Sequence, residues 1–112
     1  MMDFIDLKQQ QKLIRDKVDK RICKVLDHGQ YIQGPEVKEL EKELSLFSKS
    51  KFVLCCSSGT DALVLGLIAL GLKPNEGVIV PSFTFASTAE AVCMLGGIPF
   101  FSDVKLDTYN IC

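Results

Sequence analysis

The sequence predicts an α/β fold in which two amphipathic helices precede a parallel β-α-β-α-β core, and three observations predict it. Most charged residues lie at positions 1–51. Short apolar runs follow at 52–56, 78–80 and 98–101. Helix-length segments separate these runs, and this alternation produces a parallel sheet through crossover connections.

The first half of the chain predicts two surface helices. From Gln9 to Asp27, apolar residues recur every three or four positions among Lys, Arg and Asp, which is typical of an amphipathic helix. Gly29 is suited to end it. Pro35 is suited to begin the second helix, because its missing N–H would have no partner in a first turn, and an apolar stripe continues to Phe47. We therefore expect a loop at 29–34 and an N-terminal helical arm over residues 1–50.

Residues 51–112 predict the β-α-β-α-β part. The continuous apolar run 52–56 indicates a strand buried on both faces. The segment 60–72 has no charge after Asp61, so we expect a helix that is covered by protein on every side and is too short to span a membrane. Strands at 78–80 and 98–101 enclose a third helix at 87–95. A core of this kind is incomplete in 112 residues, so we expect self-association or the front part of a larger α/β protein.

Composition excludes several classes of function. The chain has 13 Lys and Arg residues and 14 Asp and Glu residues, so its net charge is -1. It therefore lacks the excess of positive charge that is typical of proteins that bind nucleic acid or an anionic membrane. Five cysteines and one histidine show no metal-ligand spacing and no even disulfide framework, so we expect no metal site. The first residues lack the pattern of a secretory signal, which favours the cytoplasm.

The turn from Ser57 to Thr60 is a candidate phosphate site. It lies between a predicted strand and a predicted helix, where free N–H groups and the positive end of a helix dipole favour an anion. Gly59 lets the backbone approach a ligand closely. The alternative is that Ser58 caps the helix, with Asp61 three positions on.

A second candidate segment, Pro81–Thr88, opens at the carboxyl end of the predicted sheet, where α/β proteins bind ligands. Phe83 and Phe85 are suited to stack on a planar ring, or are core residues at a strand end. Asp103 follows the third predicted strand and is either a charge partner or ordinary turn chemistry.

Other polar residues give weaker signals. Tyr31 and His28 in the loop before Pro35 are either substrate contacts or local packing groups. Cys55 and Cys56 are interpreted as small hydrophobic residues. The lysines of the two surface helices lie on charged faces, which does not favour a nucleophilic role.

Taken together, these segments resemble a known family. The motifs, in order along the chain, are Phe4–Leu7, Asp27–Val37, Ser57–Leu63, Pro81–Phe85 and Phe101–Val104. They resemble the DegT/DnrJ/StrS family of pyridoxal-phosphate-dependent sugar aminotransferases, of fold type I. The resemblance runs from Asp3 to the last residue. The sequence around Tyr31 and Pro35 is most similar to that of the branch that acts on 3-keto uronic acid sugar nucleotides.

The resemblance implies that residues 51–112 are the first part of the family's large cofactor-binding domain. It implies cofactor contacts at Ser58, Gly59 and Thr60 through phosphate, and at Phe85 through stacking on the pyridine ring. Relatives often have Asn at the position of Ser58, a departure that leaves backbone contacts intact. Tyr31 is the candidate substrate contact. The family's covalent cofactor lysine and its pyridine-nitrogen aspartate lie further along than residue 112, so no catalytic residue is assigned here.

The resemblance also implies a function for the complete family. Glutamate gives an amino group to pyridoxal 5'-phosphate, which passes it to a keto-sugar nucleotide for surface polysaccharide. We expect this chain to be a partial aminotransferase, inactive alone and part of a dimer or of a complex with a complementing chain. The alternatives are a half-enzyme completed by a second chain, a noncatalytic interaction remnant, or an unrelated phosphate-binding α/β module.

Overall fold

The computed structural model describes residues 5–112, and the first of the resembling segments therefore lies partly outside the described residues. The chain divides into two compact units, one ending at Cys55 and the other spanning Cys56–Cys112.

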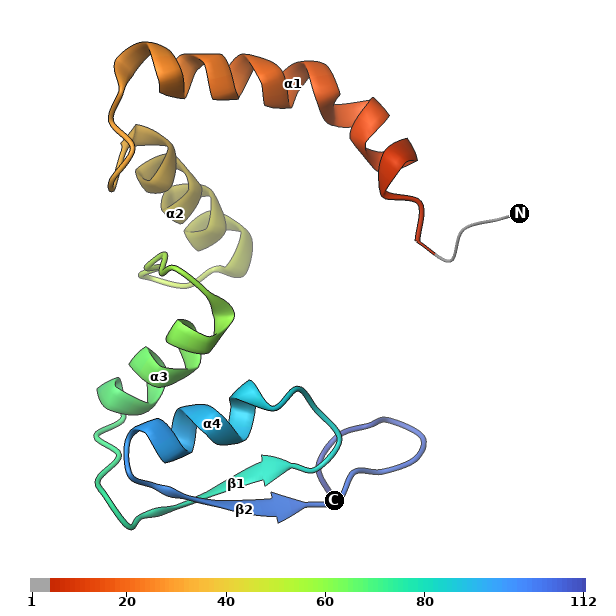
Figure 1. The fold of residues 1–112 in the computed structure, drawn as a ribbon, viewed down its shortest axis with the longest axis vertical. Coiled ribbons are helices and arrows are strands. Elements are labelled where there is room, and N and C mark those ends of the chain that lie inside the picture. Colours follow the sequence, from red (N-terminus) through yellow and green to blue (C-terminus); the bar gives the residue numbers. More distant parts are fainter. Residues whose placement is uncertain (1–4) are drawn as a thin grey trace. The chain divides into compact units, whose positions relative to one another are not determined.

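The first unit contains helices α1 (Leu7–His28) and α2 (Pro35–Ser48), as the sequence predicts (Figure 1). Asp6 caps α1 by accepting a hydrogen bond from the Gln9 N–H at 2.9 Å. Gly29 ends α1 in the left-handed region, with φ of 66°, where glycine avoids the steric cost of a Cβ. Pro35 begins α2, and residues 29–34 form the expected loop.

The second unit contains the β-α-β part of the fold. Helix α3 (Gly59–Ala69) precedes strand β1 (Gly77–Pro81), and helix α4 (Ser87–Met94) connects β1 to strand β2 (Ile98–Ser102). The two strands are parallel, in a register that pairs Gly77 with Ile98. Helix α4 packs on both strands and on α3. The predicted α/β class is therefore confirmed.

One predicted strand is not formed. Residues 52–56 have no strand partner among the described residues, so they make no ladder. Instead, the Cys55 N–H donates to Glu41 Oε1 at 2.8 Å. Phe52 and Leu54 are exposed, and Val53 and Cys55 are half-buried, which is not the two-sided burial that we expected. A continuous apolar run predicts an extended segment, whereas a strand also needs a neighbour to pair with.

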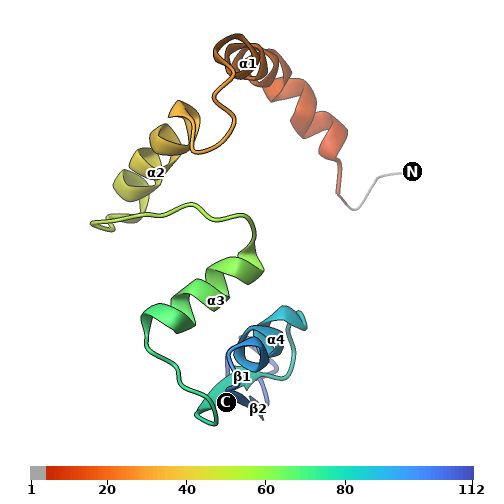
Figure 2. The same ribbon diagram turned by 60° about the vertical axis from the view of Figure 1, so that its left-hand side comes forward.

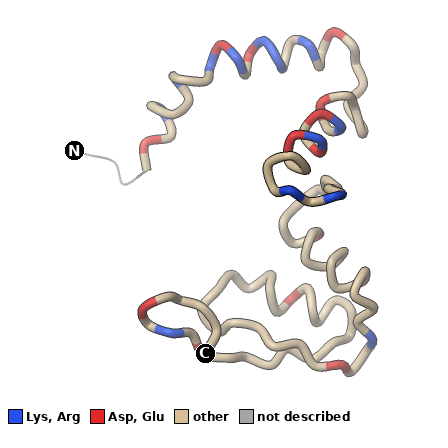
Figure 3. The backbone as a smooth tube through the Cα atoms, turned by 180° about the vertical axis from the view of Figure 1, so that it is seen from behind, with Lys and Arg blue, Asp and Glu red and all other residues tan. Residues whose placement is uncertain are grey.

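The core of the second unit lies between α4 and β1. Val80, Ala91 and Val92 are the buried apolar residues of the described chain. Helix α3 was expected to be covered on every side, but none of its residues is buried. Figure 3 shows the charges concentrated on α1 and α2, while α3 carries little charge. The sequence pattern of α3 therefore predicts its apolar character correctly but not its exposure in this structure.

Candidate functional site

The turn at the start of α3 is built as a helix N-terminus. Ser58 is the N-cap residue, with extended backbone, and its Oγ accepts a hydrogen bond from the Asp61 N–H at 3.1 Å. The Ser57 hydroxyl donates a hydrogen bond to the Asp61 carboxylate. Gly59 and Thr60 begin the helix, so their N–H groups have no acceptor within it. The capping alternative for Ser58 is thus realised, and two backbone donors beside it stay available to an anion.

The space above this turn is open. A Cβ placed on Gly59 would meet no atom of the described residues within 4 Å. Gly59 is exposed, and Thr60 and Asp61 are half-buried. A phosphate group fits these donors, because free N–H groups and the helix dipole both attract negative charge. Ser58 Oγ already serves as the cap, so the donors that remain for a phosphate are backbone N–H groups and the Thr60 hydroxyl.

The second unit brings its two candidate segments to one end. Figure 1 shows the N-terminal ends of α3 and α4 on the side where β1 and β2 have their carboxyl ends. Figure 2, turned by 60°, shows α4 against the two strands, on which it packs. The turn from Ser58 to Thr60 starts α3, and the segment containing Phe85 joins β1 to α4. This is the edge at which open α/β sheets bind ligands.

Phe85 lies in the loop just before α4 and is 77% exposed, so its ring face is available. Its carbonyl accepts a hydrogen bond from the Thr88 N–H at 3.2 Å. Phe83 is also exposed, at 71%, and its ring lies 5.8 Å from the ring of Tyr109 at a tilt of 33°. Neither phenylalanine is a core residue of the described chain, which favours the ring-contact interpretation over the core alternative.

A pocket of about 480 Å³ adjoins this loop. Its lining comes from the residues just after β1 and from the segment after β2: Ser82, Phe83, Asp103, Val104, Leu106 and Tyr109. Asp103 Oδ1 accepts a hydrogen bond from the Val104 N–H at 2.8 Å. Asp103 therefore forms a local hydrogen bond of the kind found in turns, which is one of the two alternatives for it. It also lines the pocket.

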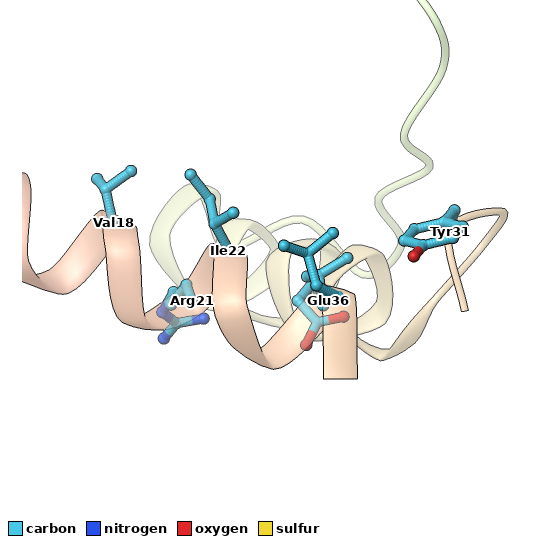
Figure 4. A pocket seen from close by; sticks show the side chains of 7 residues that line it. Val18, Arg21, Ile22, Tyr31 and Glu36 are labelled. Atoms are coloured by element: carbon cyan, nitrogen blue, oxygen red, sulfur yellow. The ribbon is translucent and has the colours of Figure 1, made fainter. Parts of the chain in front are cut away.

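The first unit has a groove of its own, of about 520 Å³. Residues of α1, the following loop and α2 line it: Val18, Arg21, Ile22, Val25, Leu26, Tyr31 and Glu36. In Figure 4, Val18 and Ile22 project from the same side of α1. Tyr31, the candidate substrate contact, is 65% exposed beside this groove.

Glu36 holds the polar edge of the groove. Its Oε1 lies 3.2 Å from Lys24 Nζ and its Oε2 lies 3.1 Å from His28 Nε2. Desolvation by burial opposes ionisation of this carboxyl. The hydrogen bond from its own backbone, followed by those of Lys24 and His28, outweighs that effect and holds the pKa of Glu36 below its ordinary value. On the same helices, the hydrogen bond and charge of Glu39 raise the pKa of Arg21.

Two side-chain relationships were not found from the sequence. The contact of Tyr109 with Phe83 joins residues far apart in the chain, and no local pattern signals it. The link from His28 to Glu36 follows from a short loop between two helices, so their spacing was a usable signal. Neither changes the assignment of Gly59, Thr60 and Phe85 as candidate contacts, or of Ser58 as the cap beside them.

Within residues 5–112, no group of three or more His, Cys, Asp or Glu side chains is arranged to hold a metal ion. The cysteines are all free. Over the same residues, no helix has both the length and the apolar character required to cross a bilayer.

Comparison with known proteins gives strong matches along nearly the whole chain. The chain is 50% identical over 111 residues to a UDP-2-acetamido-2-deoxy-3-oxo-D-glucuronate aminotransferase of Pseudomonas aeruginosa, which covers 99% of the chain and 31% of that enzyme. A solved DegT DnrJ EryC1 StrS aminotransferase from Brucella abortus matches with a TM-score of 0.95 and 46% identity, over 100% of this chain and 30% of that one.

A third match is ntda from Bacillus subtilis, solved with bound cofactor PMP, with a TM-score of 0.83 and 37% identity over 87% of this chain and 22% of that one. The chain thus spans about a third or less of the length of the relatives that it matches. The sequence profile of the DegT/DnrJ/EryC1/StrS aminotransferase family matches residues 12–112. Together with the 50% identity to the Pseudomonas aminotransferase, this match shows that the chain belongs to the DegT/DnrJ/EryC1/StrS aminotransferase family.

Proposed function

We propose that this chain supplies the phosphate-binding turn and the ring-stacking face of a pyridoxal-phosphate-dependent sugar aminotransferase. The observation that carries the proposal is the open α3 N-terminus at Gly59 and Thr60. It lies at the same end of the unit as the loop between β1 and α4, in which Phe85 is exposed. Family membership implies pyridoxal 5'-phosphate as the cofactor, and the relative ntda holds PMP, the aminated form of that cofactor.

The proposed role of each residue follows from the chemistry of its donor groups or its ring. The N–H groups of Gly59 and Thr60 and the Thr60 hydroxyl hold the phosphate, where the helix dipole adds favourable charge. Phe85 covers one face of the ring and excludes water from it. Ser58 fixes the start of the helix through its bond to the Asp61 N–H, so its role is to orient these donors. When bound, the cofactor supplies the electron-withdrawing ring for amino transfer.

The proposed reaction moves an amino group from glutamate to a keto-sugar nucleotide for surface polysaccharide. The UDP-sugar in the name of the Pseudomonas relative supports a sugar nucleotide. Tyr31, exposed beside the groove of the first unit, is the proposed substrate contact. We place the reaction in the cytoplasm, with residues 1–50 as a helical arm and residues 51–112 as the first part of the cofactor-binding domain.

We also propose that the site is completed by another polypeptide region, in a longer form of this chain, in a second copy of it or in a complementing chain. Large apolar side chains support this, because Leu13, Phe47 and Leu70 are each at least 80% exposed. An extensive exposed apolar surface marks an interaction site. A noncatalytic interaction remnant would use the same surface, and cofactor binding distinguishes it from an enzyme.

The test compares two glycines of α3. Gly59 and Gly66 both have open space where a Cβ would be, but only Gly59 lies at the N-terminus. In the full-length natural protein, Gly59→Leu is expected to weaken binding of pyridoxal phosphate, measured by absorbance titration, because the side chain fills the proposed phosphate position. Gly66→Leu is the matched control and is expected to leave binding unchanged. Equal affinities in the two variants would contradict the assignment.

A further inference from the structure

The segment after β2 closes on itself. The Cys112 N–H donates to the Asp103 carbonyl at 2.9 Å, and the Lys105 N–H donates to the Asn110 carbonyl at 2.9 Å. The Tyr109 N–H donates to the Lys105 carbonyl at 2.8 Å. We call residues 103–112 the closing loop. Its backbone bonds fix its shape without help from the site.

The closing loop fixes the position of the Tyr109 ring. Tyr109 has φ of 56°, in the left-handed region that non-glycine residues seldom adopt. A residue stays in such a conformation when its surroundings determine it. Here the bond from the Tyr109 N–H to the Lys105 carbonyl and the bond accepted by the Asn110 carbonyl do so. The result is that the Tyr109 ring lies 5.8 Å from the Phe83 ring, a distance typical of an aromatic pair.

Phe83 belongs to the loop that carries Phe85. This loop, residues 82–86, is anchored at its start by the Ser82 N–H, which donates to the Ser102 carbonyl at 2.8 Å. At its other end the Phe85 carbonyl accepts from the Thr88 N–H at 3.2 Å. Phe85 itself is 77% exposed, so few contacts of its own ring hold it in place. The orientation of Phe85 therefore depends on the contacts that hold residues 82–84, which precede it in the loop.

We propose that Phe83 and Tyr109 are positioning residues: their ring pair holds the loop 82–86 so that Phe85 presents its face to the cofactor. This inference rests on the proposed function in assigning the cofactor ring to Phe85. The anchoring itself does not depend on the cofactor. The contact between the two residues is a ring-to-ring contact, so the aromatic ring of Tyr109 is the group that the proposal needs.

The first measurement is hydrogen exchange of residues 82–88 in the full-length natural protein without cofactor. The Ser82 and Thr88 amides report on this loop, because each donates one of its anchoring bonds. Tyr109→Leu removes the ring and keeps an apolar side chain, and we expect exchange to become about threefold to tenfold faster. Tyr109→Phe keeps the ring and should restore the slow exchange.

A control variant comes from the same loop. Leu106 also lines the pocket beside Phe83 but is 90% exposed and is not part of the ring pair. Leu106→Ala is expected to leave exchange in residues 82–88 unchanged. If Tyr109→Leu perturbs folding, which the thermal midpoint reports, Phe83→Leu breaks the same pair from the other side and should give the same acceleration.

The second measurement is the dissociation constant of pyridoxal phosphate. Tyr109→Leu should weaken binding about threefold to tenfold, and Tyr109→Phe should not. Unchanged exchange in both Tyr109→Leu and Phe83→Leu would overturn the anchoring, and faster exchange with unchanged affinity would overturn the positioning role. Phe85→Ala is measured alongside. Normal cofactor binding in Phe85→Ala would overturn the proposed function instead, while the exchange result still decides the anchoring.

Discussion

His28 Nε2 lies 3.1 Å from Glu36 Oε2, so the last residue of α1 is joined to the first turn of α2. The other ring nitrogen, Nδ1, accepts a hydrogen bond from the Gln30 N–H at 3.0 Å. In a neutral imidazole one nitrogen accepts and the other donates. The Gln30 bond therefore assigns the hydrogen to Nε2, which donates to Glu36 and fixes the loop that carries Tyr31.

The first prediction concerns pH. The pKa of Glu36 is lower in the folded protein than its ordinary value of 4.5. Its stabilising contribution is therefore complete above pH 4.5 and is lost as the pH falls through the lowered value. We expect the α1–α2 junction to loosen over that acid range, seen as a loss of protection of the Gln30 amide relative to its intrinsic exchange rate at each pH. Glu36→Gln should remove this pH dependence.

The control for this prediction is Glu43→Gln, because Glu43 is an exposed glutamate on the same helix. It should leave the acid transition of the Gln30 amide in place. A transition that persists unchanged in Glu36→Gln would assign it to another group.

Thr60→Val tests the hydroxyl at the phosphate turn. The substitution keeps the shape of the side chain and removes one donor, and such a charge-assisted bond is worth about 1.5–3 kcal/mol. Cofactor affinity should fall about tenfold or more. Titration of the full-length protein measures this, with Thr60→Ser as the control, because serine keeps the hydroxyl donor and should keep the affinity.

Phe85→Ala tests the stacking face. Loss of the ring should cost about 1–3 kcal/mol of cofactor binding, which is about fivefold to a hundredfold in affinity. Cys55→Ala, in the other unit, should affect packing around that half-buried residue and not the cofactor. Unchanged affinity in both Thr60→Val and Phe85→Ala would mean that these segments are a helix cap and a surface loop only.

Self-association is expected from the surface. Helix α3 contains Leu63, Leu65 and Ile68, each more than 40% exposed, and it has no charged residue after Asp61. Burying such side chains against a partner is favourable by roughly 25 cal/mol per Å². Sedimentation velocity should show a dimer or a larger complex. A concentration-independent monomer with sharp near-ultraviolet dichroism would show that α3 tolerates solvent.

No lysine among residues 5–112 is expected to bind the cofactor covalently. Every lysine there is exposed, and lysine nucleophiles are activated by desolvation or by a neighbouring charge. Borohydride reduction followed by peptide mapping measures this. Stoichiometric labelling of Lys51 or Lys73 would contradict it and would assign a reactive amine to this part of the protein.

Local signals in the sequence predict the helices well. Gly29 ends α1 and Pro35 begins α2 because their backbone preferences act at single positions, whatever the rest of the chain does. Ser58 is likewise a cap that can be seen in four residues of sequence. The same local chemistry predicts the candidate phosphate turn, since free N–H groups follow from any helix start.

Features that need a distant partner could not be predicted in this way. The run 52–56 has strand-like residues, but a strand requires a second segment that only the three-dimensional arrangement supplies. Tyr109 is an ordinary loop residue in the sequence, and its left-handed backbone depends on bonds within the closing loop. Its pairing with Phe83 is therefore a property of tertiary structure.

The parallel pairing of β1 and β2 has a consequence for the order of folding. Gly77 pairs with Ile98, and α4 lies between these two residues in the sequence. The sheet therefore cannot form until the crossover through α4 has been made. Helices of this length relax in about a microsecond, whereas a non-local pairing must first overcome the entropy of closing the loop. During synthesis on a ribosome, α1 and α2 can therefore fold as they emerge. The residues of β1 stay unpaired, and accessible to chaperones, until β2 has been synthesised.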